Sequence, residues 1–282
     1  MSYLRRASPL HAARASGGAA YAGALIVAAL VLAHPLVLGV LALAVLGAGV
    51  GAGVGRRVLR SLYLSLPMAL LIVLVNAFVS RNGLTVIARL GDGGPLGQLD
   101  ITLEAVAYGA KAALVLVVII ASAALASAAV DPDELLRSLR RVSFRSALTA
   151  TVATRMVPLL ALDAKRISEA QRCRPHPGGR MAVMRAITAN ALDRSLDIAA
   201  TLEVRGYGSA RRPTRVRRPW SRHDLAFASS AVAIVALPFA LPASFSFYPV
   251  IRGSYGVATF ALAGALALAV LAPFAQRRGI AR

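Results

Sequence analysis

Two arginines stand at the ends of two expected helices, where their side chains could bind a partner. Arg174 closes the stretch "AQRCRP" and Arg205 lies in "EVRGYG", so a helix breaker follows each of them at once. A guanidinium is a planar, permanently charged fork that binds carboxylate and carbonyl oxygens. The alternative is a cation that only offsets the negative end of a helix dipole, an effect of about 0.3–1 kcal/mol. A task shared by both arginines would explain why the arrangement occurs twice.

Two antiparallel helices must hold these arginines. The first is expected over about 145–174 and stops at "PHPGG" (175–179), because two prolines and two glycines cannot continue a helix. The second is expected over about 181–205, and Gly206 ends it in the left-handed conformation that glycine takes most easily.

The second helix carries an apolar stripe at helical spacing. Its members are Met184, Ile187, Ala191, Ile198 and Leu202. We expect this stripe to pack against the first helix, which leaves Arg205 at a free tip. The alternative is an ordinary amphipathic helix that lies on the membrane surface.

Composition places the chain among polytopic α-helical membrane proteins, so the expected fold class is all-α. The 282 residues are 57% hydrophobic and only 6% aromatic, with a mean hydropathy of +0.66. One cysteine and four histidines exclude a disulfide framework and a dense His/Cys metal site. A membrane-embedded enzyme would need titratable groups that converge at membrane depth, and the expected spans contain Lys111 and no acidic residue. We therefore expect no catalytic residue, no cofactor and no resident metal.

Six apolar stretches are long enough to cross about 30 Å of hydrocarbon. They cover about 19–34, 36–55, 62–79, 105–130, 225–243 and 254–274. The predicted organisation is therefore N-terminal spans over 1–130, a cytoplasmic region of helices over 131–224, and C-terminal spans over 225–282. In the second span, Gly47, Gly51 and Gly55 lie four residues apart, which lets helices approach closely in lipid. A phosphate-binding loop would need Gly-Lys-Ser/Thr where "RR" follows.

The charges predict the orientation in the membrane. Residues 131–224 hold 19 of the 32 Lys/Arg and 9 of the 12 Asp/Glu, and further arginines lie near both termini. The positive-inside rule then places this segment and both termini in the cytoplasm. The predicted location is the inner (plasma) membrane. The basic arm "ARRPTRVRR" (210–218) is expected to flank the next span and to contact anionic lipid.

The chain also resembles the transmembrane T component of energy-coupling factor (ECF) transporters, the family that includes the cobalt transporter membrane subunit. The resemblance covers about residues 80–210. In that family one helix ends in an Ala-Gln-x-x-Arg-Gly-like signature and a second in Glu-x-Arg-Gly-Tyr or Phe, similar to "AQRCRP" and "EVRGYG" here. The stretch "ITLEAVAYGAKAALVLV" is similar to a Thr-x-Glu-x-x-x-x-Gly motif of the family. One departure is Pro175, which stands where the family usually has glycine or serine.

The resemblance implies a mechanism and a set of partners. The T component itself is not an enzyme; it couples two ABC-type ATPase subunits to a separate membrane protein, the S component, which holds the vitamin or metal ion. ATPase-coupling positions carried over by the motifs are Gln171, Cys173, Arg174, Glu203, Arg205 and Gly206. The alternative function is a membrane anchor whose basic region binds nucleic acid or anionic lipid. Tyr207 and Trp220 are too few for a base-stacking platform, so nucleic acid is not an expected partner.

Overall fold

The computed structural model describes residues 7–80, 83–90, 99–139, 144–175, 179–206, 220–241 and 243–275. The chain divides into two units, each described by itself below. The span unit comprises Met1–Leu135 and Trp220–Arg282, and the hairpin unit comprises Leu136–Pro219. The expected boundaries, 130/131 and 224/225, each differ from these limits by five residues.

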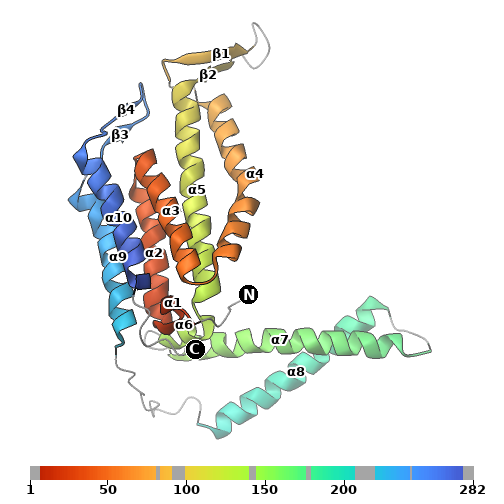
Figure 1. The fold of residues 1–282 in the computed structure, drawn as a ribbon. Coiled ribbons are helices and arrows are strands. Elements are labelled where there is room, and N and C mark those ends of the chain that lie inside the picture. The colour runs from red at the N-terminus through yellow and green to blue at the C-terminus, as the bar shows by residue number, and fades with distance from the viewer. Residues whose placement is uncertain are drawn as a thin grey trace. The chain divides into compact units, whose positions relative to one another are not determined.

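The described helices of the span unit form a bundle, which confirms the predicted all-α fold class (Figure 1). They are α1 (Pro9–Ala12), α2 (Ala15–Val31), α3 (Pro35–Gly51), α4 (Gly55–Val79), α5 (Leu103–Ala129), α9 (Arg222–Ala240) and α10 (Val257–Ala275). Short α6 (Pro132–Leu139) follows α5. Of these, α4, α5, α9 and α10 are long and apolar enough to cross a membrane. Helices α2 and α3 are equally apolar but have 17 residues each, the lower limit for a span.

The break between α2 and α3 follows from one proline. His34 is held in the extended region (φ −80°, ψ 120°), as the ring of the following proline requires. Pro35 then occupies the first turn of α3, where a missing N–H costs nothing. Each of the six apolar stretches in the sequence thus corresponds to one helix of the span unit.

The glycine row is divided between two helices, so the expectation that one span carries it was wrong. Gly53 adopts a positive φ of 71°, which ends α3 at Gly51 and lets α4 begin at Gly55. A Cβ added at Gly47 would lie 3.1 Å from Leu271, and one at Gly51 would lie 3.0 Å from Phe274. These two glycines therefore let α10 approach α3. A Cβ at Gly55 would instead meet Val50, across the tight turn between α3 and α4.

The core of the span unit lies between α2, α3, α5, α9 and α10. Tyr21 is fully buried there, and its hydroxyl donates a 2.8 Å hydrogen bond to the carbonyl of Val270. Its ring meets those of Phe227 and Phe274 edge-on, at centroid distances of 5.2 and 6.3 Å. Helix α4 packs beside α5 at the margin of the bundle, and most of its large apolar side chains are exposed. Such a surface is what a helix facing lipid presents.

The "TLEAVAYG" motif at the start of α5 joins this helix to the preceding hairpin and to α4. Strands β1 (Val86–Leu90) and β2 (Leu99–Thr102) pair antiparallel, and the Thr102 hydroxyl then caps α5 by accepting from the Ala105 amide. Glu104 is buried, and both of its carboxylate oxygens lie 3.2 Å from the Thr85 amide, which donates to them. Gly109 lies against the backbone of α4, where an added Cβ would come 3.1 Å from the Cα of Val73.

A second small hairpin joins α9 to α10. Strands β3 (Phe245–Ser246) and β4 (Arg252–Gly253) pair antiparallel. The ring of buried His34 packs edge-on against Phe245 and Tyr255, at 5.0 and 5.2 Å. Both hairpins lie at the same end of the span unit (Figure 1). This end is therefore closed by aromatic and backbone contacts between segments that are far apart in the sequence.

At the opposite end of the span unit, Arg14 holds the first turn of α9. The Arg14 amide donates a 2.6 Å hydrogen bond to Asp224, and its Nε lies 3.3 Å from the other carboxylate oxygen. Asp224 also accepts from the Ser221 amide, while the Ser221 hydroxyl accepts from the Asp224 amide, which completes a capping box. The guanidinium lies over the Trp220 ring at 5.5 Å. Asp224 is buried, so this ion pair fixes where the chain rejoins the bundle.

Candidate functional site

The hairpin unit consists of two long helices, α7 (Phe144–Arg172) and α8 (Arg180–Val204). Both begin and end within two residues of the expected limits. The helices contact each other, and one polar cluster joins them: Asp163 on α7 accepts from Asn190 and Arg194 on α8, at 3.2 and 3.1 Å. These three residues belong to no motif that was recognised in the sequence.

The half-buried stripe on α8 differs from the expected apolar stripe in its first residue. Ile187, Ala191, Ile198 and Leu202 are half-buried, in line with the prediction. Met184 is 59% exposed, and Val183 is the half-buried residue at that turn. Four further apolar residues of this helix are exposed: Met181, Leu192, Leu196 and Val204. Met184 lies 18 residues, or five turns, before Leu202 and so points in the same direction as the stripe, and spacing alone did not show that it stays exposed.

Gly206 ends α8 as the sequence predicts. Its φ of 76° lies in the left-handed region, and its N–H donates a 2.8 Å hydrogen bond to the carbonyl of Glu203. The Arg205 amide donates to the carbonyl of Thr201 at 3.2 Å, which is the last hydrogen bond of the α-helical pattern. The side chains of Glu203 and Arg205 are both exposed. This cap holds the Arg205 Cα firmly while its guanidinium faces solvent.

The end of α7 is built differently. The helix stops at Arg172, and the amides of Cys173 and Arg174 donate to the carbonyls of Glu169 and Gln171, both at 3.3 Å. Pro175 follows, and because a proline has neither an N–H nor access to positive φ, no glycine-type cap forms there. Cys173 and Arg174 are exposed, and Gln171 is half-buried.

Both arginines thus have exposed side chains at the end of a helix, but the backbone of the two helix ends differs. Within the described part of the chain, neither guanidinium has a carboxylate partner at salt-bridge distance. An exposed guanidinium at a helix end can donate several hydrogen bonds to one planar acceptor of another protein. The pair is therefore suited to docking and carries no group that could act as a nucleophile or general base at neutral pH.

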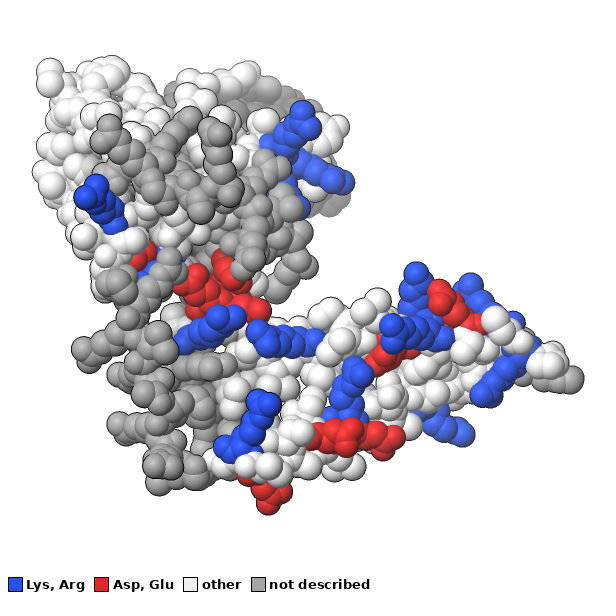
Figure 2. Space-filling view, turned by 60° about the horizontal axis from the view of Figure 1, so that its bottom comes forward, with Lys and Arg blue, Asp and Glu red and all other residues white. Residues whose placement is uncertain are grey.

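Charged side chains of both signs lie along the helices of the hairpin unit (Figure 2). One of the pairs is Lys165 with Glu169, four residues apart on α7, at 3.8 Å and largely exposed. Exposed pairs of this kind contribute little, about 0–1 kcal/mol. The Asp163 cluster differs, because the Asp163 side chain is only 15% exposed.

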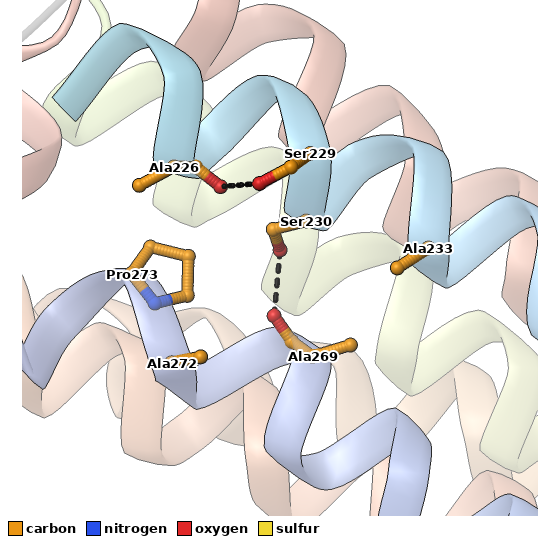
Figure 3. A pocket seen from close by; sticks show the side chains of 7 residues that line it. All are labelled: Ala226, Ser229, Ser230, Ala233, Ala269, Ala272 and Pro273. Carbon is orange, nitrogen blue, oxygen red and sulfur yellow. Dashed lines mark hydrogen bonds between the residues drawn. The ribbon is translucent and has the colours of Figure 1, made fainter. Parts of the chain in front are cut away.

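An open groove of about 360 Å³ lies between α9 and α10. Small side chains line it: Ala226, Ser229, Ser230, Ala233, Ala269, Ala272 and Pro273. The Ser230 hydroxyl donates across it to the carbonyl of Ala269 at 2.6 Å, and Ser229 donates to Ala226 of its own helix (Figure 3). None of the lining residues is charged. Over the described ranges, no group of three or more His, Cys, Asp or Glu could hold a metal ion.

These features define a multi-pass α-helical membrane protein whose charged residues gather in a helical hairpin. The chain belongs to the CbiQ family of cobalt transport proteins, the family of ECF transporter T components. The family model matches residues 6–217, from α1 to beyond the end of α8. A search of curated proteins found no match. The resemblance drawn from the two arginine motifs is therefore confirmed at the level of the family.

Proposed function

We propose that this protein is the energy-coupling T component of an ECF-type ABC importer. The observation that carries the proposal is the pair of exposed arginines, Arg174 and Arg205, at the ends of two helices that are tied together by Asp163. Membership of a cobalt transport family that is the family of ECF transporter T components supports it.

Under this proposal, each arginine docks into one of two ABC-type ATPase subunits. Closure of the ATPase pair moves α7 and α8, and this movement reorients an S component that holds the cobalt ion or a vitamin. Arginine suits the task because a planar, bidentate contact transmits both a push and a direction. The span unit supplies the membrane anchor and the lipid contacts, and the protein itself carries out no chemical step.

Co-purification from the native membrane tests the proposed partners. The full chain, tagged and solubilised in mild detergent, is expected to retain two ATPase polypeptides and one small membrane protein, identified by mass spectrometry. As a matched control for the loss of Arg174 and Arg205, the variant Arg166→Ala/Arg185→Ala should retain the same partners. Both of these arginines are exposed and lie within α7 and α8 rather than at their ends. Recovery of RNA in place of an ATPase would contradict the proposal and favour a nucleic-acid-binding anchor.

In the proposed topology, the hairpin unit and both termini lie on the cytoplasmic side of the plasma membrane, and β1 and β2 lie on the outer side. Cys173, the one cysteine of the chain, is exposed and should react with an impermeant thiol reagent only after permeabilisation. A cysteine at Leu84, which is 70% exposed, should react in intact cells when Cys173 is replaced by alanine. Labelling of Cys173 in intact cells would contradict this orientation and indicate the opposite one.

A further inference from the structure

Each helix of the hairpin carries a charged residue within a half-buried stripe. On α7 the stripe reads Leu160, Asp163 and Ile167, and on α8 it reads Ala191, Arg194 and Ile198. In both helices the charge therefore stands between apolar neighbours at helical spacing. A charge at such a place is costly unless it has a partner. Here each charge is the partner of the other.

The geometry of the cluster distinguishes one alignment of the two helices. One oxygen of Asp163, Oδ2, accepts both from Asn190 Nδ2 at 3.2 Å and from Arg194 Nη1 at 3.1 Å. The two donors are four residues apart, so they come from successive turns of α8. A slide of α8 by one turn in either direction would replace one of the two donors with an apolar side chain, Ala186 or Ile198. A polar group within an apolar helix contact is known to select register in this way.

The cluster also lies at matching places along the two helices. Asp163 precedes Arg174 by eleven residues, and Arg194 precedes Arg205 by the same number. At a rise of 1.5 Å per residue, α7 extends about 14 Å from the cluster to its end at Arg172, and α8 about 15 Å to its end at Val204. The two helical arms measured from the contact are therefore nearly equal in length.

We propose that Asp163, Asn190 and Arg194 form a register lock, a positioning site that sets the distance between the two arginine-bearing ends. Its place in transport rests on the proposed function, since the lock matters for uptake only if both ends dock on the ATPases. The lock itself is a property of the hairpin and can be measured without any partner.

The test measures the distance between the two ends in the full chain. Spin labels on Cys173 and on a cysteine at Val204, which is 90% exposed, lie next to the two arginines. Double electron–electron resonance in lipid nanodiscs should give one narrow distance for the otherwise unchanged chain. In Asp163→Asn or Arg194→Gln, the population outside this peak should rise at least about tenfold, on the scale of one charge-assisted hydrogen bond.

Matched controls separate the lock from a general loss of charge. Glu169→Gln removes the exposed pair with Lys165 on the same helix, and Asp193→Asn removes an exposed carboxylate next to Arg194. Both should keep the narrow peak. The exchange Asp163→Arg with Arg194→Asp should restore the peak, which a variant that merely misfolds would not do. The lock is refuted if Asp163→Asn and Arg194→Gln leave the distance distribution unchanged.

Uptake by the assembled transporter distinguishes the two proposals. If the distance distribution broadens and uptake falls in the same variants, both proposals hold. If the distribution broadens while uptake stays normal, the lock is real, but the coupling role of the two ends is wrong.

Discussion

Replacing both Arg174 and Arg205 with alanine is expected to abolish uptake by the assembled transporter. Each arginine is exposed at a helix end and is proposed to lose its water on docking, so truncation would leave the partner's acidic or carbonyl groups unpaired. Removing one side of such a desolvated contact costs roughly 2–5 kcal/mol. Each single variant should then bind the ATPase pair at least about 30-fold more weakly. The measurements are uptake of labelled substrate in cells and the affinity for the ATPases in detergent.

The control for this prediction is the pair Arg166→Ala and Arg185→Ala, which removes the same charge from the same two helices. It should leave uptake within about twofold of the unchanged protein, as exposed charges away from an interface contribute little. The two sets of variants should have equal thermal stability, because neither arginine end is buried. Normal transport by the Arg174→Ala/Arg205→Ala variant would end the coupling hypothesis.

Gly109→Val is expected to separate α4 from α5 and to reduce the yield of folded protein severely. An added Cβ would lie 3.0 Å from the Asn76 Cβ, 3.1 Å from the Val73 Cα and 3.2 Å from the Val73 carbonyl oxygen. Two of these three atoms belong to the backbone of α4, so no side-chain rotation can make room. Overpacking of a rigid contact costs about 1–3 kcal/mol, and the two extra methyls of valine add to this. Thermal unfolding in detergent and the monodisperse yield are the measurements.

Gly39→Val is the matched control for this variant. Gly39 also lies inside a membrane helix, but an added Cβ there has no neighbour within 4 Å. This variant should unfold near the temperature of the unchanged protein, since both substitutions carry the same change in helix propensity. Equal stability of the two variants would mean that α4 is free to move away from α5.

The helices of this protein were predictable because local rules determine them. Long apolar runs gave all six helices of the bundle, and the breakers around Pro175 and Gly206 gave the limits of α7 and α8. The turn at Gly53 was missed, since in the row of glycines from 47 to 55 nothing in the spacing tells a packing glycine from a turn glycine. The left-handed conformation of one member, together with the contacts of its neighbours, decided that question.

The contacts that organise the candidate site depend on residues far apart in the sequence. The expected α8 stripe had a seven-residue gap between Ala191 and Ile198, and Arg194 lies inside it. A charge in such a gap was the available signal for a partner on the other helix, but only the structure identified Asp163. The burial of Glu104 likewise depends on Thr85, which lies across a hairpin. An acidic residue beside a span was visible in the sequence, whereas its partner was not.

The contact between Arg14 and Asp224 closes a loop across 210 positions of the chain. Loop-closure entropy grows slowly, by about 0.6 kcal/mol for each doubling of length, so inserted residues within the hairpin unit would strain this closure little. The end of the chain before α2 is a different matter. A truncation that removes the residues up to Arg14 would leave a buried carboxylate without its cation, at the first turn of a helix more than 200 residues away. The start of α9 therefore depends on Arg14, a residue that precedes α2.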